Sequence, residues 1–344
     1  MKILIIRFSS MGDIVQAMSV ISALLSRYPD ATIEWVTKQE FTGLLELDVR
    51  VKKIWSLDRK KGFLGLIQLA WQIRKSDHQE GYNVIYDAHQ NLRTLVLKWV
   101  LRPFWFILPR RVFTRSKERL RRLFLFFFKV NLFPKPFRGM ISYLAPLRAL
   151  GAPVDYILKG QWSFTQNLRE RVQSLLPKNK HIALAPSAAW AMKRWPTEHW
   201  KKLIELLPEQ QFVLLGGPQD NFLADIALAA PERVLNLAGK LSLAESAYAI
   251  TCCELLISAD TGMIHMADLL GHPGISLMGP TAFGFCSGQT IRTLEVALPC
   301  RPCTKDGRGK CHREIYQECM TAITPEVVAR AIKQSKLESF NMNI

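Results

Sequence analysis

Short apolar runs alternate with helical patterns from one end of this chain to the other. Each run resembles a buried strand, and most of the segments between them carry apolar residues at helical spacing. Such alternation predicts an α/β fold with parallel sheets, because parallel neighbours need a crossover connection. A final helix is predicted over 325–336, with Thr324 as its N-cap. The seven predicted strands are residues 2–7, 32–36, 84–86, 182–185, 212–215, 255–258 and 275–278.

Two domains are expected, because 344 residues are enough for two separate cores. The alternating pattern breaks between residues 102 and 136 and resumes after 177–180. A C-terminal helix is expected to end the chain and could pack back on the first domain. The predicted divisions are a first domain over 1–155, a linker region over 156–180, a second domain over 181–322 and the C-terminal helix over 323–344.

The charge of the chain points to an anionic partner. The chain has 46 Lys and Arg against 29 Asp and Glu, which gives a formal net charge of +17. Nucleic acid, a phospholipid surface and a phosphorylated substrate are the partner classes that such a charge favours. The sequence carries no nucleic-acid-binding motif, so nucleic acid is not expected as a partner.

No targeting or membrane-spanning segment is expected. The chain begins directly with a predicted strand, without a separate apolar segment or a small-residue cleavage site. No apolar run approaches the roughly 20 residues that span a bilayer, and the run at 123–130 is short and contains Lys129. We therefore predict a cytoplasmic protein, in which the seven cysteines favour free thiols or metal binding over disulfides.

The first turn of the chain carries the first candidate site. The sequence FSSMGDIVQA, residues 8–17, joins the first predicted strand to a helical pattern over 14–25. Ligands of doubly wound sheets bind at such turns, and Ser10, Gly12 and Asp13 lie there. The turn has neither G-x-x-x-x-G-K-S/T nor G-x-G-x-x-G. Its aspartate therefore suggests a base or a hydroxyl-binding group rather than a phosphate cradle.

A second candidate site lies in APSAAWAMKRWPTEHW, residues 185–200. Ser187 falls on the turn after a predicted strand, and Lys193 and Arg194 come just before a predicted helix start at Pro196 and Thr197. Cations beside a helix N-terminus strengthen an anion site. The alternative is a solvated loop with two surface cations.

A third candidate site lies in SADTGMIHMADLLG, residues 258–271. Thr261 and Gly262 would offer backbone N–H groups to a diphosphate at a helix N-terminus. Asp260 could instead cap that helix. His265 falls one turn further on, on the face of Thr261, where a histidine is either structural or directed at the ligand.

The three segments share one arrangement. Each lies at the carboxyl end of a predicted strand, and they are divided between the two domains. Two Rossmann-like domains facing a central cleft, with an acid on one side and an anion site on the other, are the layout of a GT-B glycosyltransferase. The motifs SSMGDIVQA, KRWPTEHW, GGPQD and DTGMIHMADLLGHPGISLMGPT resemble those of glycosyltransferase family 9, the ADP-heptose:lipopolysaccharide heptosyltransferases.

This resemblance implies a GT-B fold and inverting transfer of a heptose from ADP-heptose to the inner core of lipopolysaccharide, on Kdo-lipid A or a heptosylated intermediate. The first domain would take the lipid-linked acceptor, with Asp13 as general base, and the second would take the donor, with Lys193 at its diphosphate. The other implied donor-binding residues are Asp260 and His265 beside the sugar and diphosphate, Thr261 and Gly262 at the phosphates, Asp220 at the ribose and Leu241 near the adenine.

Two departures from the family pattern leave the donor open. Ser187 and Ala188 stand where relatives often carry glycine or threonine, and Asp220 replaces the longer glutamate of some relatives. The alternatives are a transferase of the same fold that uses another nucleotide sugar, and a non-catalytic binder of anionic lipid or nucleic acid. A protein that only binds its ligand would have no role for an acid such as Asp13 opposite a diphosphate site at Lys193. These two residues therefore favour an enzyme over a non-catalytic binder.

The chain has no D-x-D pair that could hold a metal ion on the diphosphate. Lys193 and the helix N-terminus at Thr261 would then stabilise the charge that develops on the leaving group. We therefore predict metal-independent transfer that requires no cofactor for catalysis.

The middle of the chain is basic and aromatic. Between residues 101 and 139 lie eleven Arg or Lys and one acid, Glu118, together with FWFIL at 104–108 and LFLFFF at 123–128. One interpretation is a core helix with a basic solvent face. The other is a segment that lies in the interface of an anionic membrane. This second interpretation, together with Arg59, Lys60 and Lys61 as acceptor-binding cations, predicts peripheral association with the cytoplasmic face of the inner membrane.

Four cysteines lie close together near the end of the second domain. Cys300, Cys303, Cys311 and Cys319 follow the spacing C-x2-C-x7-C-x7-C. The first pair favours a structural zinc site, whereas the other spacers do not match a zinc ribbon. Reduced thiols, a disulfide, and His312 as a competing fourth ligand are the alternatives. The other three cysteines, Cys252, Cys253 and Cys286, are expected to be buried packing residues.

Overall fold

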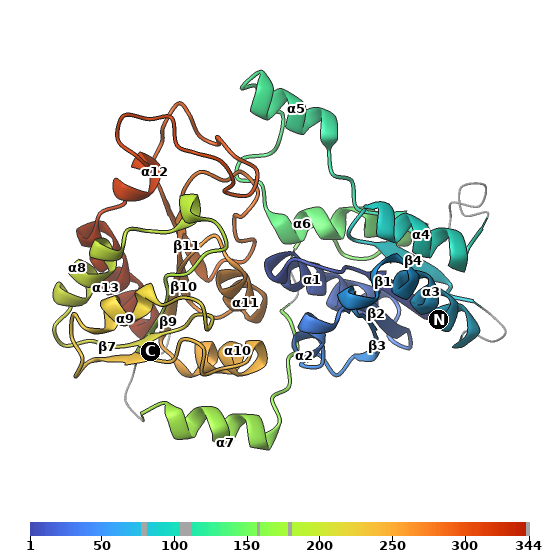
Figure 1. The fold of residues 1–344 in the computed structure, drawn as a ribbon, viewed down its shortest axis with the longest axis horizontal. Coiled ribbons are helices and arrows are strands. Elements are labelled where there is room, and N and C mark those ends of the chain that lie inside the picture. The colour runs from blue at the N-terminus through green and yellow to red at the C-terminus, as the bar shows by residue number, and fades with distance from the viewer. Residues whose placement is uncertain (77–80, 104–111, 157–158, 178–180, 342–344) are drawn as a thin grey trace. The chain divides into compact units, whose positions relative to one another are not determined.

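The computed structural model describes residues 1–76, 81–103, 112–156, 159–177 and 181–341. They form two compact units, Met1–Leu120 with Gly139–Ser163, and Arg121–Arg138 with Phe164–Ile344. Each unit is a parallel sheet covered by helices (Figure 1). The predicted α/β class with two Rossmann-like units is therefore confirmed. The FWFIL run lies outside the described residues.

The first unit contains a sheet with the strand order β3-β2-β1-β4-β5, in which the paired strands are parallel. Its order reverses between β1 and β4, where ligands bind in such folds. The elements, with 3-10 helices marked η, are β1 (Lys2–Ile6), α1 (Met11–Arg27), β2 (Thr32–Lys38), η1 (Gln39–Phe41), α2 (Thr42–Leu45), β3 (Val51–Leu57), η2 (Arg59–Lys61), α3 (Gly62–Ser76), β4 (Val84–Asp87), α4 (Leu92–Leu101), β5 (Val112–Thr114), the start of α5 (Arg119–Phe127), α6 (Gly139–Leu144) and η4 (Ala145–Leu150).

The core of the first unit follows from the alternation of side chains along β1. Leu4 and Ile6 point to one face of the sheet, where they cluster with residues of α3 and α4 such as Leu66 and Leu97. Helices α3 and α4 pack side by side, and α1 packs against α6. Because residues 3–6 of β1 are fully buried, they form a continuous apolar run.

The second unit contains a sheet with the strand order β11-β10-β9-β6-β7-β8, again parallel. Its order reverses between β6 and β9. The elements are α7 (Gln166–Leu175), β6 (His181–Ala185), η5 (Ala191–Lys193), α8 (Thr197–Glu205), β7 (Gln211–Leu214), α9 (Phe222–Ala227), β8 (Val234–Asn236), α10 (Leu243–Cys252), β9 (Leu255–Ala259), α11 (Gly262–Leu270), β10 (Gly274–Met278), β11 (Ile291–Glu295), α12 (Glu318–Thr321) and α13 (Pro325–Asn341).

The core of the second unit joins both ends of its sequence. The rings of Trp195 and Trp200 meet edge to face at a centroid distance of 4.9 Å, and the Trp195 indole donates to the carbonyl of Ile323 at 2.7 Å. Val328 and Ile332 of α13 belong to the same buried cluster. The predicted C-terminal helix is thus part of the second unit's core.

All seven predicted strands are present, and four further strands, β3, β5, β8 and β11, were not predicted. The segment Arg121–Arg138, which lies within the predicted first domain, groups instead with the second unit. Leu125 and Phe133 cluster there with Ala282, which explains this grouping. In the described residues, no helix is long and apolar enough to cross a membrane.

Candidate active site

Asp13 lies at the point where the first sheet reverses its order. The strand β1 ends at Ile6, and α1 begins at Met11 with Ser10 as its N-cap. The hydroxyl of Ser10 donates to Oδ2 of Asp13 at 2.9 Å, and the backbone N–H of Ser10 donates to the same oxygen at 3.4 Å. This capping box fixes the first turn of α1 and holds the Asp13 carboxylate at the strand end.

Two residues from other parts of the first unit complete the contacts of Asp13. Nη2 of Arg7 lies 2.5 Å from Oδ2 of Asp13, and the Tyr143 hydroxyl donates to Oδ1 at 2.9 Å. The Arg7 side chain is buried, and its Nη1 donates to the carbonyl of Ala88 at 2.7 Å. The carboxylate is therefore held at both oxygens while its side chain remains 39% exposed.

The electrostatic surroundings keep Asp13 ionised. Burial by itself would raise the pKa of Asp13, but the charges of Arg7 and Arg115 and the hydrogen bonds from Ser10 and Tyr143 lower that pKa well below its usual range. Burial raises the pKa of Tyr143 to about 12, so its hydroxyl stays a proton donor to Asp13. The guanidinium of Arg115 lies 3.7 Å from the centre of the Tyr143 ring.

The neighbouring strand end, after β4, is fixed by a buried ion pair. Nζ of Lys98 lies 2.8 Å from Oδ2 of Asp87, and Oδ1 of Asp87 accepts the backbone N–H groups of His89 and Gln90. Burial lowers the pKa of His89 to about 3, so this ring is neutral at pH 7. Its Nδ1 accepts the backbone N–H of Phe8 at 3.2 Å and so ties the two strand ends together.

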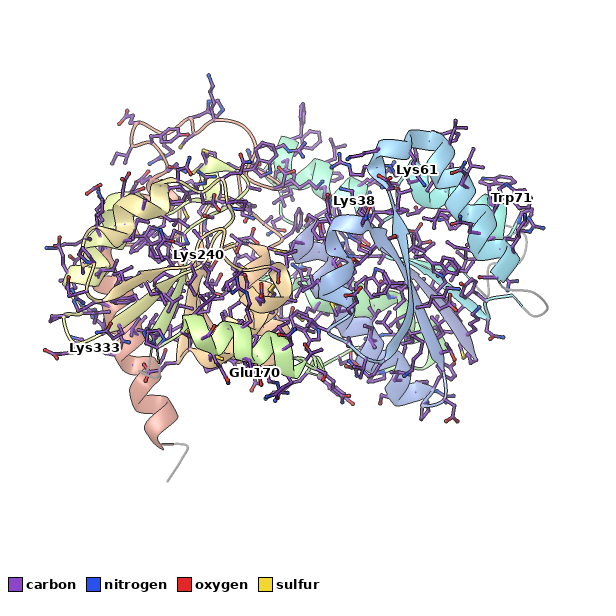
Figure 2. The ribbon with its side chains drawn as sticks, turned by 60° about the horizontal axis from the view of Figure 1, so that its bottom comes forward. Lys38, Lys61, Trp71, Glu170, Lys240 and Lys333 are labelled. Carbon is purple, nitrogen blue, oxygen red and sulfur yellow. The ribbon has the colours of Figure 1, made fainter. Side chains whose placement is uncertain are left out.

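The remaining predicted acceptor-binding residues lie at the same edge of this sheet. Gly12 is in the first turn of α1, next to Asp13. Arg59, Lys60 and Lys61 form η2 directly after β3, and all three are exposed. The carboxylate of Asp58 accepts the backbone N–H of Lys60 at 2.8 Å. Lys61 is labelled at the surface of the first unit in Figure 2.

In the second unit, Asp260 lies where the sheet order reverses, directly after β9. Its Oδ2 lies 2.8 Å from Nζ of Lys193 and accepts the hydroxyl of Thr281 at 2.7 Å. Its Oδ1 lies 3.4 Å from Nε2 of His265. Burial would raise the pKa of Asp260, but Lys193 and His265 lower it well below its usual range. The structure thus joins three of the predicted donor-binding residues through one carboxylate.

A glycine of the loop after β10 presses against this carboxylate. A Cβ atom on Gly284 would lie between 1.9 and 2.3 Å from the carboxylate atoms of Asp260. Gly307 has a similar relation to Lys193, since a Cβ there would lie 2.6 Å from the Lys193 side chain, and its φ of +95° also favours glycine. The backbone therefore approaches Asp260 closely at Gly284 and Lys193 closely at Gly307.

Thr261 rather than Asp260 caps α11. The Thr261 hydroxyl accepts the backbone N–H of Met263 at 3.3 Å and lies 2.9 Å from the Ser258 hydroxyl. Gly262 is the first residue of the helix. The N-terminus of α11, with its positive end of the helix dipole, lies beside the Lys193–Asp260 pair. This arrangement can bind an anion such as a diphosphate.

The other predicted donor-binding residues lie at the carboxyl ends of β6, β7 and β8. Oγ of Ser187 is buried and has no hydrogen-bond partner in the described residues. Asp220 accepts the backbone N–H of Gly217 at 2.7 Å and so closes the GGPQD loop. Leu241 is half-buried and comes just before Ser242, the N-cap of α10.

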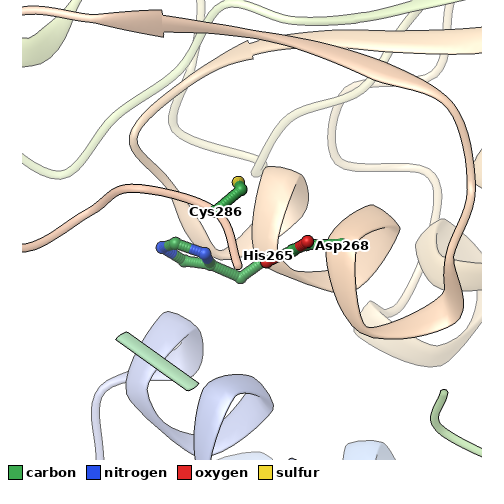
Figure 3. Close-up of side chains that lie close together, drawn as sticks. All are labelled: His265, Asp268 and Cys286. Carbon is green, nitrogen blue, oxygen red and sulfur yellow. The ribbon is translucent and has the colours of Figure 1, made fainter. Parts of the chain in front are cut away.

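His265 of this site also belongs to a buried group of three side chains. His265, Asp268 and Cys286 bring ligand-type atoms within 4.8 Å of one another, and in the described residues they form the one such group of three (Figure 3). Asp268 accepts the backbone N–H groups of Ser287 and Gly288, both at 2.7 Å. Burial raises the pKa of Cys286 well above its usual value. The two hydrogen bonds to Asp268 therefore hold the loop after β10 against α11.

The cysteines of the C-x2-C segment are not part of that group. Cys300 and Cys311 are partly buried, Cys303 is exposed and Cys319 is buried, all of them as free thiols. Burial raises the pKa of Cys319 to about 11, which favours its thiol form. A structural zinc site there stays a prediction. Cys253 and Cys286 are buried as predicted, whereas Cys252 is exposed, so that prediction was wrong for this residue.

Sequence reasoning missed Arg7, Tyr143 and Arg115. Arg7 carries a signal, because a cation directly after a buried strand is placed at the binding edge of the sheet. Tyr143 lies 130 residues from Asp13 in the sequence and carries no local signal. Thr281 is the last residue of the motif DTGMIHMADLLGHPGISLMGPT, and its hydrogen bond to Asp260 was not predicted.

Comparison with known families identifies one family for this chain. The profile of glycosyltransferase family 9 (heptosyltransferase) matches residues 105–316, which is more than half of the chain. The chain belongs to glycosyltransferase family 9. It is therefore an enzyme of the glycosyltransferase class.

Individual members of family 9 match nearly the whole chain. The lipooligosaccharide heptosyltransferase 2 of Haemophilus ducreyi is 26% identical to this chain. The match covers 97% of this chain and 99% of that relative. The structure of the E. coli ADP-heptose lps heptosyltransferase II has a TM-score of 0.74 at 21% identity, and the match covers 98% of this chain and 99% of that chain. That of the E. coli heptosyltransferase WaaC with ADP-2-deoxy-2-fluoro heptose has a TM-score of 0.66 at 18% identity, covering 97% and 99%. These likenesses confirm the predicted GT-B fold.

Proposed function

We propose that this family 9 enzyme transfers a heptose from ADP-heptose to the inner core of lipopolysaccharide, with inversion at the anomeric carbon. The names of its relatives support this substrate class, since they include lipooligosaccharide heptosyltransferase 2 and an enzyme solved with ADP-2-deoxy-2-fluoro heptose. The observation that carries the proposal is the ionised Asp13 carboxylate, held at a ligand-binding strand end and still partly exposed.

Asp13 is the general base in this proposal. Its carboxylate takes the proton of the acceptor hydroxyl as that oxygen attacks the anomeric carbon. The bond from the anomeric carbon to the diphosphate breaks in the same step, and ADP leaves with the electron pair. A single in-line displacement of this kind inverts the anomeric centre. Ser10 and Gly12 lie next to the base and would contact the acceptor.

Lys193 and the N-terminus of α11 are the positive groups for the leaving diphosphate. Lys193 is paired with Asp260 at 2.8 Å and can share its charge with a phosphate placed beside it. The hydroxyl of Thr261 and the backbone N–H of Gly262 would donate to phosphate oxygens. His265, held by Asp260, would contact the donor sugar or diphosphate.

The rest of the donor would extend along the carboxyl edge of the second sheet. Asp220 would accept the ribose hydroxyls, and Leu241 would pack against the adenine. Ser187 has a buried hydroxyl with no hydrogen-bond partner in the described residues, and an oxygen atom of ADP-heptose would supply one. Because Lys193 and the helix N-terminus supply positive charge, we propose that the transfer needs no metal ion.

The proposed acceptor is a phosphorylated, lipid-linked sugar. Its negative charge suits a chain with a net charge of +17 and the exposed cations Arg59, Lys60 and Lys61. An acceptor embedded in the inner membrane would require the enzyme to work at the membrane surface as a peripheral protein.

The experiment that tests this function is mass spectrometry of Kdo-lipid A incubated with the protein and ADP-heptose, alongside the Asp13→Asn variant. A mass gain of one heptose that requires Asp13 is the expected result. If Kdo-lipid A gains no mass, a heptosylated core acceptor is the next substrate. No gain on either acceptor, together with no protection of the protein against heating by ADP-heptose, would contradict the proposed donor.

A further inference from the structure

Helix α5 (Arg119–Phe127) presents a stripe of large apolar side chains to solvent. Leu120, Leu123, Phe124 and Phe127 follow the spacing i, i+3, i+4 and i+7, which places them on one face of the helix. Their exposed fractions are 74%, 50%, 40% and 76%, and the next residue, Phe128, is 55% exposed. We call these five residues the α5 stripe. Soluble proteins rarely expose apolar patches of this kind without a partner.

The opposite face of α5 explains why the stripe is held in place. Leu125 is only 2% exposed and belongs to a cluster with Phe133 and Ala282. The ring of Phe126 meets that of Phe283 edge to face at 6.0 Å, and Phe133 meets Phe283 at 5.1 Å. The helix is thus anchored to the second unit by one apolar face. The α5 stripe is the second apolar face, and α5 itself is labelled in Figure 1.

The residues after the helix extend the same apolar surface. Val130 is 47% exposed and Leu132 is 50% exposed. Close by, a pocket of about 1040 Å³ opens in the second unit. Its lining combines apolar groups such as Leu125 and Phe137 with cations that include Lys129 and Arg138. Apolar groups next to cations suit an anionic amphiphile, since the former can contact its acyl chains and the latter its charged headgroup.

The charge around the α5 stripe selects among partners. Residues 115–138 contain eight Lys or Arg and one acid, Glu118. Two copies of a chain with a net charge of +17 would bring these cations together at the stripe, which disfavours self-association. An anionic lipid surface offers both an apolar interior for the stripe and negative headgroups for the cations.

We propose that the α5 stripe is an interfacial anchor, which inserts into the headgroup–acyl boundary of an anionic bilayer while the neighbouring Arg and Lys residues bind the headgroups. The inference rests on the proposed function only in taking this bilayer to be the one that carries the acceptor. The anchor is separate from the residues at which the reaction is proposed to occur.

Co-sedimentation with vesicles tests the anchor in the full-length protein. The protein is expected to bind vesicles that contain phosphatidylglycerol and to bind phosphatidylcholine vesicles much more weakly, with binding that falls as salt rises. The double variant Leu123→Ser/Phe127→Ser should bind the anionic vesicles about 10- to 100-fold more weakly, because two inserted apolar side chains are lost. Leu228→Ser, at a residue that is 72% exposed in α9's C-cap position, is the matched control and should bind like the wild type.

Three results would overturn the anchor. These are unchanged binding of the double variant, equal binding of the wild type to both kinds of vesicle, and a wild-type dimer that the double variant converts to monomer. Transfer to a water-soluble, deacylated acceptor separates this inference from the proposed function. The double variant should retain that transfer and lose transfer to an acceptor in anionic vesicles. If the wild type transfers heptose to neither acceptor but still binds anionic vesicles, the proposed function fails and the anchor stands.

Discussion

Arg7 and Asp13 form an ion pair across the turn between β1 and α1, with Nη2 of Arg7 at 2.5 Å from Oδ2 of Asp13. The arginine is the first residue after the central strand, and the aspartate is in the first turn of the helix that follows. This pair lowers the pKa of Asp13 and orients its carboxylate. A base of low pKa accepts a proton only late in the reaction, so its orientation towards the acceptor hydroxyl matters more than its basicity.

The first prediction concerns Asp13 itself. Asp13→Asn should lower kcat by about 10²–10⁴, the usual size of a general-base effect. The KM for ADP-heptose should change little, because the proposed donor-binding residues belong to the second unit. Steady-state kinetics with Asp30→Asn as the control, at an exposed position of the same unit, checks this. A near-normal kcat for Asp13→Asn would show that another group is the base.

The second prediction concerns pH. Because the pKa of Asp13 is lowered, its carboxylate should stay ionised, and the kcat of the wild type should show no acidic limb from Asp13 down to about pH 4. In Arg7→Met the pKa should rise towards its ordinary value of about 3.9, so that roughly half of kcat is lost at pH 4 relative to pH 7. The exposed Arg27, mutated in Arg27→Met, is the control.

The same pair affects stability with a defined sign. A carboxyl group whose folded pKa is lowered stabilises the fold above its unfolded pKa, and this contribution disappears as the pH falls through the folded pKa. Arg7→Met should therefore lower the Tm at pH 7, and the difference from the wild type should shrink in acid. In the pH profile of kcat, by contrast, an acidic limb near pH 6 in the wild type would contradict the assignment of Asp13 as the base.

The sequence predicts the central strands of both sheets but not the edges. The strands that were missed, β3, β5, β8 and β11, are the edge strands of the two sheets. An edge strand is partly exposed and therefore mixes polar with apolar residues, as IRTLE does in β11. The central strands are buried on both faces, which requires the continuous apolar runs that sequence analysis recognises.

The candidate sites follow the same division between local and distant information. Strand-end turns are local, so Asp13 and Asp260 could be singled out from their positions after apolar runs. Lys193 could be singled out from its position just before a predicted helix. Contacts such as Tyr143 with Asp13, or Gly284 with Asp260, join residues that are distant in the sequence. Such contacts depend on how loops pack over the sheet edge, which the pattern of a single sequence does not encode.

The third prediction concerns Lys193. Lys193→Ala should weaken ADP binding by about 10- to 100-fold, because it removes a charge-assisted contact of roughly 1.5–3 kcal/mol. Calorimetric titration with ADP measures this, and the exposed Lys202, mutated in Lys202→Ala, is the control. The variant also leaves Asp260 buried without its cation, so its Tm must be recorded. Unchanged ADP affinity would exclude Lys193 from the diphosphate site.

The fourth prediction concerns metal ions. If Lys193 and the N-terminus of α11 stabilise the leaving diphosphate, the rate of heptose transfer should be the same in excess EDTA as in its absence. The measurement is an initial rate after prior treatment with EDTA, followed by addition of Mg²⁺ or Mn²⁺. A rate that falls with EDTA and returns with either ion would contradict metal-independent transfer.

The fifth prediction concerns the fit of the loop after β10 over Asp260. In Gly284→Ala the added Cβ would lie between 1.9 and 2.3 Å from the carboxylate atoms of Asp260, so the loop or the carboxylate must move. Because Asp260 holds Lys193 and His265, the KM for ADP-heptose should rise at least about tenfold, the cost of a single lost contact of about 1.4 kcal/mol.

Gly43→Ala is the matched control for Gly284→Ala, since a Cβ on Gly43 meets nothing within 4 Å. Gly43 lies in α2, where alanine is favoured over glycine by about 0.5–1 kcal/mol, so the control should keep its kinetics and its Tm or raise the Tm slightly. A Gly284→Ala variant with the kinetics of Gly43→Ala would show that the loop moves aside without disturbing Asp260. The close approach of Gly284 would then have no part in donor binding.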